Sequence, residues 1–145
     1  MSSAVPPPSS WIVRPQPPRP RVLLAEGDEL TARVVHHRLT RDGMDVTAVR
    51  DGVAAMDALS TQAFDVAIID AVLVGVDGLD LVRRVRLGEA GPSDIGIGVL
   101  CWPGNDSLLA RAYALDADNV MVRPLSLVAL SASVARLARR PRVRP

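Results

Sequence analysis

The stretch Phe64–Gly78, FDVAIIDAVLVGVDG, decides the fold. Residues 66–69 are apolar without alternation, which is typical of a strand buried on both faces, as in a parallel sheet covered by helices. Asp70 stands at the carboxyl end of this predicted strand. Ligands collect at that edge of open parallel sheets, so Asp70 is a candidate functional residue. An aspartate here can also simply end a strand or start a turn, so the other strands must decide.

Short apolar runs alternate with amphipathic segments from residue 21 to 139, which predicts five strand–helix units. The predicted strands are residues 22–25, 44–49, 66–69, 95–101 and 120–122, and the predicted helices are 30–41, 53–59, 79–86, 108–115 after a cap at Asp106 or Ser107, and from Ser126 onward. The predicted fold class is α/β, a doubly wound five-stranded parallel sheet with helices on both faces. The first helix is expected to bury its apolar face, Leu30, Val34, Val35 and Leu39.

The ends of the chain differ from its body. We expect a disordered Pro-rich tail over residues 1–20, one domain over residues 21–139, and a basic tail over residues 140–145, which we expect to be solvated. Every acidic residue lies between Glu26 and Asp118, whereas arginines extend into both tails. A nucleic-acid partner is not expected, because no aromatic residue is interleaved with the arginines.

The apolar runs, the first residues and the cysteine content of the sequence indicate the compartment in which the protein works. The chain has no apolar run of the roughly 18 residues that a membrane span needs, and its Pro-rich start does not resemble a signal peptide. Cys101 is the single cysteine, so no internal disulfide can form. We therefore expect a cytoplasmic protein.

Polar residues follow four of the predicted strands. Glu26 and Asp28 follow the first strand, Asp70 the third, Cys101 the fourth and Arg123 the fifth. Because the carboxyl ends of parallel strands meet at one edge of a sheet, these side chains are expected to converge there.

The order and spacing of these residues resemble the receiver domain of bacterial two-component response regulators over residues 22–139. FDVAIIDAVLVGVDGLDLV resembles the family's phosphoacceptor segment, with Asp70 as the phosphoacceptor; LLAEGDE resembles its acidic magnesium-binding turn; ADNVMVRPLSL resembles its segment with a lysine followed by proline. The resemblance implies a flavodoxin-like fold and phosphoryl transfer from a histidine kinase or a phosphotransfer protein. It also implies an output surface on the fourth helix, fifth strand and fifth helix, through which a homodimer could form.

Several positions depart from the family's pattern. Gly27 stands where the family has its principal metal-binding aspartate, so the resemblance leaves Glu26, Asp28 and Asp70 as a weakened Mg2+ site. Arg123 replaces the lysine. Two further changes affect the switch and the mouth of the pocket: Cys101 replaces the switch Ser or Thr, and the bulky Trp102 could gate the pocket.

Three functions remain open. The first is a stand-alone, atypical response regulator in a phosphorelay, which is not an enzyme and acts through regulated protein contacts. The second is a degenerate receiver that works as a binding module without phosphorylation. The third is a small phosphohydrolase with Asp70 as nucleophile, although Val72 stands where such enzymes place a second aspartate.

For the cysteine and the two histidines of helix 30–41 we expect no chemical role. Cys101 invites a redox role, but we expect a buried small hydrophobe, because Arg123 is the only cationic group placed to lower its pKa. His36 and His37 are adjacent on a helix and point in different directions, so we expect solvated side chains and not a chelating pair.

Overall fold

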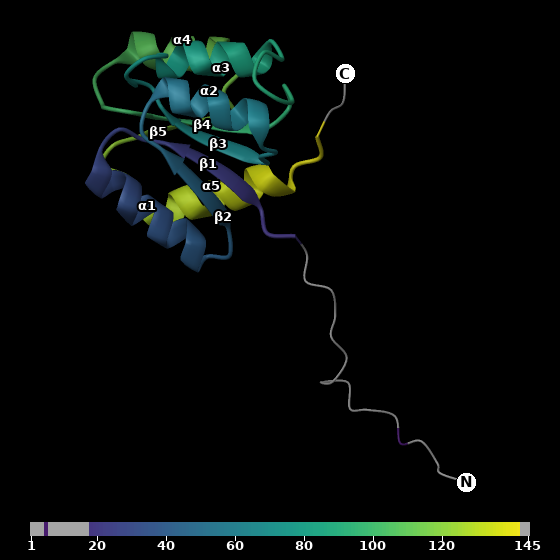
Figure 1. Cartoon of the computed structure of the whole chain (residues 1–145). Coiled ribbons are helices and arrows are strands. Elements are labelled where there is room, and N and C mark those ends of the chain that lie inside the picture. The colour runs from purple at the N-terminus through teal and green to yellow at the C-terminus, as the bar shows by residue number, and fades with distance from the viewer. Residues whose placement is uncertain (1–4, 6–17, 143–145) are drawn as a thin grey trace.

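The computed structural model describes residue 5 and residues 18–142. Five parallel strands form one sheet in the order β2-β1-β3-β4-β5. The strands are β1 (Arg21–Ala25), β2 (Asp45–Val49), β3 (Val66–Asp70), β4 (Gly96–Cys101) and β5 (Asn119–Val122), and the helices are α1 (Glu29–Arg41), α2 (Gly52–Thr61), α3 (Gly78–Arg86), α4 (Asp106–Ala114) and α5 (Leu127–Arg139). Helices α1 and α5 cover one face of the sheet, and α2, α3 and α4 cover the other (Figure 1). The predicted doubly wound α/β fold is confirmed.

The apolar core has two halves, one on each face of the sheet. Along β1, Leu23 and Ala25 pack under α2, α3 and α4, whereas Val22 and Leu24 pack under α1 and α5. Strand β3 pairs with β1 on one side and β4 on the other, and all five of its residues are buried. Its uninterrupted apolar run therefore makes β3 the central strand, and it places Asp70 in the middle of the carboxyl edge.

The buried face of helix α1 differs from the predicted one. Val35 and Leu39 are buried as expected, and Ala32 completes the inward face. Leu30 and Val34, which were predicted to face the core, are 70% and 43% exposed. The buried face is narrower than the apolar stripe because Leu30 and Val34 lie on the flank of the helix, where they line open grooves with Leu127.

Helix α4 buries little of its apolar surface. Leu108, Leu109 and Leu115 are only half-buried, and Ala112 is the one fully buried residue of the helix. The predicted cap at Asp106 or Ser107 is wrong: Asn105 is the N-cap, and its Oδ1 accepts a hydrogen bond from the Leu108 N–H at 3.0 Å.

The two glycines of β4 mark close packing. A Cβ atom on Gly96 would lie 2.9 Å from the Leu137 Cβ of α5, and one on Gly98 would lie 2.9 Å from the side-chain ends of Ile68 and Met121. Glycine inside a strand usually marks the close approach of backbone or of a neighbouring helix, and here Gly96 lets α5 pack directly against the sheet.

Parts of the predicted organisation lie outside the described residues, including most of the predicted N-terminal tail and the last three residues. The boundaries of the three predicted segments remain predictions. In the part of the chain that the structure describes, no helix is both long enough and apolar enough to cross a membrane.

Candidate functional site

Asp70 ends the central strand at the carboxyl edge of the sheet. Asp70 is 9% exposed, and its Oδ1 accepts a hydrogen bond from the Val72 N–H at 3.0 Å. Ala71 N–H donates to the carbonyl oxygen of Leu100 at 2.9 Å, so the backbone just after Asp70 is still held by β4. The carboxylate is therefore presented by a rigid strand end.

Arg123 joins Asp70 to Glu26. Its Nη2 donates to Glu26 Oε2 at 2.6 Å and to Asp70 Oδ2 at 2.9 Å. The side chains of Arg123 and Glu26 are 7% and 2% exposed, so this is a buried carboxylate–guanidinium–carboxylate bridge. Its members come from the ends of β1, β3 and β5, and the predicted convergence of these three residues is observed.

Burial sets the electrostatics of the bridge. It raises the pKa of Asp70 above its ordinary value, and the Glu26 carboxylate adds to the rise, against the lowering effects of the Val72 N–H and Arg123. Burial lowers the pKa of Arg123, but its hydrogen bond to Glu26 and the two carboxylate charges outweigh burial and raise it. The guanidinium therefore stays positively charged between the two carboxyl groups.

Asp28 is not part of this bridge. It is the exposed N-cap of α1, where its Oδ2 accepts hydrogen bonds from Thr31 N at 2.9 Å and from Thr31 Oγ1 at 2.6 Å. The Thr31 hydroxyl and then the Thr31 backbone N–H lower the pKa of Asp28. Asp28 contacts the site through its backbone, whose N–H donates to Glu26 Oε1 at 3.1 Å, and the Arg123 charge also lowers the pKa of its carboxyl.

The carboxylates as arranged do not fit a magnesium ion. Glu26 and Asp70 are both bound by a guanidinium, Asp28 is bound by Thr31, and Gly27 has no side chain. Among residues 18–142 and residue 5, no group of three His, Cys, Asp or Glu side chains could hold a metal ion. The Glu26, Asp28 and Asp70 ligand set thus remains a prediction that this geometry does not support.

Cys101 and Trp102 lie beside the bridge. Cys101 is 4% exposed, and burial raises the pKa of its thiol, while Arg123 lowers it and Asp70 raises it. Trp102 is 68% exposed, and the centre of its ring lies 5.3 Å from Arg123 Cζ, which is a cation–π contact. Trp102 therefore lies against the guanidinium of Arg123, and its role as a gate remains a prediction.

Two features of the site were missed from the sequence. The first is the sharing of one guanidinium by Glu26 and Asp70; the only signal for it was an arginine, whose planar fork can bind two carboxylates, in place of lysine. The second is the exposed apolar flank of α1, Leu30 and Val34, for which the helical period gave no signal because it predicted both residues inside.

Comparisons with known proteins agree with this geometry. The response regulator receiver domain family matches residues 22–135. The response regulator protein PmrA of Pseudomonas aeruginosa is 37% identical over 123 residues, which cover 83% of this chain and 53% of that protein. The transcriptional activator protein PfeR of the same species is 31% identical over 126 residues, which cover 87% of this chain and 40% of that protein. The chain spans about half the length of the curated relatives it matches.

Solved structures show the same fold. The receiver domain of the Francisella response regulator 1452 has a TM-score of 0.77 and 23% identity, covering 83% of this chain and 98% of that chain. The receiver domain of the sensor histidine kinase PA1611 from Pseudomonas aeruginosa has a TM-score of 0.75 and 22% identity, with 83% and 98% coverage. The structure of the PA1611 domain holds a magnesium ion in its active-site cleft.

Proposed function

This chain belongs to the response regulator receiver domain family, and we propose that it acts in two-component signalling through protein contacts controlled at Asp70, the phosphoacceptor. The observation that carries this proposal is the position of Asp70. It ends the central strand, is largely buried, and is within hydrogen-bond distance of the buried cation Arg123. Its atypical and cytoplasmic character is part of the same proposal.

In the proposed reaction an Asp70 carboxylate oxygen attacks the phosphorus atom of a phosphohistidine on a kinase or a phosphotransfer protein. The P–N bond breaks, its electron pair stays with the imidazole nitrogen, and an acyl phosphate forms on Asp70. Two negatively charged groups must approach each other, so a fixed cation is needed beside them. Arg123 supplies that charge at 2.9 Å from Asp70 Oδ2.

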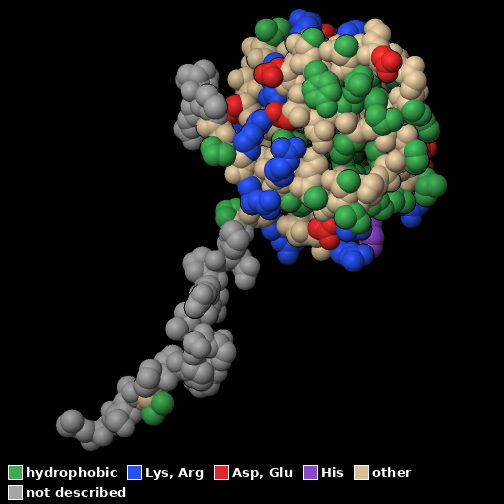
Figure 2. Space-filling view, turned by 180° about the vertical axis from the view of Figure 1, so that it is seen from behind, with side chains coloured by type: hydrophobic (Ala, Val, Ile, Leu, Met, Phe, Trp, Pro, Cys, Tyr) green, Lys and Arg blue, Asp and Glu red, His purple; other side chains and the backbone are tan. Residues whose placement is uncertain are grey.

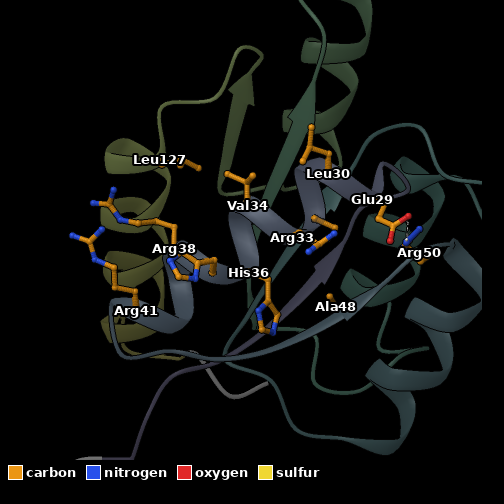
Figure 3. Close-up of a pocket in the computed structure, with 12 residues that line it drawn as sticks. Glu29, Leu30, Arg33, Val34, His36, Arg38, Arg41, Ala48, Arg50 and Leu127 are labelled. Carbon is orange, nitrogen blue, oxygen red and sulfur yellow. Dashed lines mark ion pairs between the residues drawn. The ribbon is translucent and has the colours of Figure 1, made fainter.

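The flank of α1 supports a protein partner. Leu30 and Val34 are exposed, and with Leu127 they border an open groove of about 830 Å3 (Figure 3). Arginine side chains surround this groove; they are Arg33, Arg38, Arg41 and Arg50, of which Arg50 pairs with Glu29 at 3.5 Å. Apolar side chains ringed by arginines suit a partner that presents apolar and acidic side chains.

A binding module that works without phosphorylation is the second candidate. It is favoured by the bridge itself, because Glu26 and Asp70 are already compensated by Arg123. The thiol of Cys101 is also a weaker hydrogen-bond donor than the hydroxyl that the family uses as a switch. A phosphohydrolase is not favoured: Val72 is 69% exposed and carries no group that could donate a proton.

Intact-mass measurement after incubation with acetyl phosphate tests the proposal. We expect the wild-type chain to gain one phosphoryl group and Asp70→Asn to gain none. Asp77→Asn is the matched control, because Asp77 is exposed in the following loop and its side chain makes no capping hydrogen bond. Equal labelling of Asp70→Asn and wild type, or no labelling of either, would exclude Asp70 as the phosphoacceptor and leave the binding module.

A further inference from the structure

We propose that Arg123 is the resident cation of the Asp70 pocket and takes the place of a divalent metal ion. The side chains of Glu26 and Asp70 are only 2% and 13% exposed. Two buried carboxylates so close together need a positive charge between them. The Nη2 group of Arg123 lies within hydrogen-bond distance of both, so this need is met by the chain itself.

A magnesium ion would compete with Arg123 for the same oxygen atoms. It requires near-octahedral oxygen ligands at about 2.0–2.1 Å. Two of these oxygens, Glu26 Oε2 and Asp70 Oδ2, are both bound to Nη2. A guanidinium keeps its charge at every working pH, so the ion would have to displace a cation that cannot be neutralised.

Even with the arginine moved away, the pocket would bind a divalent metal ion only weakly. Gly27 supplies no side-chain ligand, and Asp28 is held by Thr31 at the start of α1. Glu26 and Asp70 are the two carboxylates that the bridge brings together, and affinity for a hard cation falls with the number of carboxylates.

Contacts on other sides hold Arg123 in place. The indole of Trp102 lies over Cζ at 5.3 Å. The backbone N–H of Arg123 donates to the Cys101 carbonyl oxygen at 2.9 Å, which ties the end of β5 to the end of β4. The guanidinium thus lies between two carboxylates on one side and an aromatic ring on another.

One donor of the guanidinium remains free. Within the described part of the chain, Arg123 Nε is buried and has no hydrogen-bond acceptor. An oxygen of an incoming phosphoryl group would satisfy it, so the same side chain could balance the resting carboxylates and bind the transferred group. This last step rests on the proposed function, whereas the replacement of the metal does not.

Binding of Mn2+, a paramagnetic substitute for Mg2+, tests the replacement without any phosphodonor. Free Mn2+ is measured by electron paramagnetic resonance with the wild-type chain and with Arg123→Gln, which removes the competing charge. We expect Arg123→Gln to bind Mn2+ at least about tenfold more tightly than wild type. We also expect Mg2+ to raise the melting temperature of Arg123→Gln and to leave that of wild type unchanged. Equal or weaker Mn2+ binding by Arg123→Gln overturns the proposal.

Gly27→Asp provides a positive control for metal binding, and it shows whether wild type binds Mn2+ only weakly if Arg123→Gln does not fold. A Cβ atom at Gly27 would lie 3.4 Å from the Arg50 carbonyl oxygen, an ordinary contact, so an aspartate can be accommodated. We expect Gly27→Asp to bind Mn2+ at least about tenfold more tightly than wild type, and the control Gly27→Ala to match wild type. Wild-type binding as tight as that of Gly27→Asp contradicts the proposal.

Separate experiments can contradict the phosphoacceptor proposal for Asp70 and the resident-cation proposal for Arg123. If Arg123 serves as the cation, labelling of wild-type Asp70 by acetyl phosphate should proceed at the same rate in EDTA and in Mg2+. Labelling that is abolished by EDTA contradicts the resident-cation proposal while supporting the phosphoacceptor. If Asp70 is never labelled, the proposed function fails, and the Mn2+ measurements still decide whether Arg123 replaces the metal.

Discussion

At the scale of single residues, Cys101 shows how burial governs chemistry. The side chain ends β4 next to the Asp70 pocket and is 4% exposed. A thiol reacts as its thiolate, and burial raises the pKa of Cys101 more than the Arg123 charge lowers it. At any given pH the fraction of thiolate is therefore smaller than for a solvated cysteine. This favours the structural interpretation of Cys101 over a redox role.

Thiol labelling under native conditions checks this inference. We expect Cys101 to react with a disulfide reagent at pH 8 at least about tenfold more slowly in the folded chain than in urea. Because the sequence contains one cysteine, the signal has a single source. Labelling of the folded chain as fast as the unfolded chain would support a reactive, redox-active Cys101.

At the scale of elements, α1 packs against the sheet with one face and exposes apolar side chains on its flank. Its inward residues Ala32, Val35 and Leu39 are buried against the sheet. At its C-terminal end it is linked to α5, since the Ser131 hydroxyl donates to Asp42 Oδ2 at 2.5 Å. Leu30 and Val34 contribute little to this packing and are available to a partner. The exposed flank can therefore change without loss of the fold.

A substitution on this flank should affect transfer between proteins but not labelling by a small molecule. We expect Leu30→Ser to slow transfer from a phosphorylated histidine phosphotransfer protein by about tenfold, because removing a central apolar contact weakens docking. Labelling by acetyl phosphate should stay unchanged. The matched control is Val53→Ser, since Val53 is 61% exposed on α2, across the sheet. The docking proposal fails if Val53→Ser slows transfer as much as Leu30→Ser.

At the scale of the whole molecule, arginines and acids gather at the opposite edge of the sheet from Asp70. Asp118 accepts hydrogen bonds from Arg86 at 3.0 Å and from Arg140, while Asp94 Oδ1 pairs with Arg142 at 3.0 Å. Figure 2 shows arginine and acidic side chains side by side near the C-terminal end of the described chain. Arg140 and Arg142, at the start of the predicted basic tail, are thus partly exposed and also form ion pairs with the acidic body of the protein.

This cluster should contribute measurably to stability. We expect Arg140→Gln to lower the free energy of unfolding by about 1 kcal/mol, because the ion pair with Asp118 is only partly exposed. Arg139→Gln, at an exposed neighbouring position, should change it by less than about 0.5 kcal/mol. Urea denaturation at low and high salt measures both, and the difference should shrink in high salt. An equal effect of the two variants would show that the pair is not stabilising.

The sequence by itself determined the fold and the position of the candidate site. Unbroken apolar runs specify buried parallel strands, and the carboxyl ends of such strands must meet at one edge. For that reason Glu26, Asp70 and Arg123 could be predicted to converge before any coordinates were known.

Only the tertiary structure decided how the converging groups are paired. Asp28 and Glu26 are two residues apart, yet Asp28 caps a helix while Glu26 is buried against Arg123. That difference arises from the direction in which each side chain leaves the turn, which residue type and spacing do not encode. The same holds for the exposure of Leu30, since burial depends on how far the neighbouring elements extend over a helix. Sequence specified which charges meet at Asp70, and packing specified that a guanidinium lies between them.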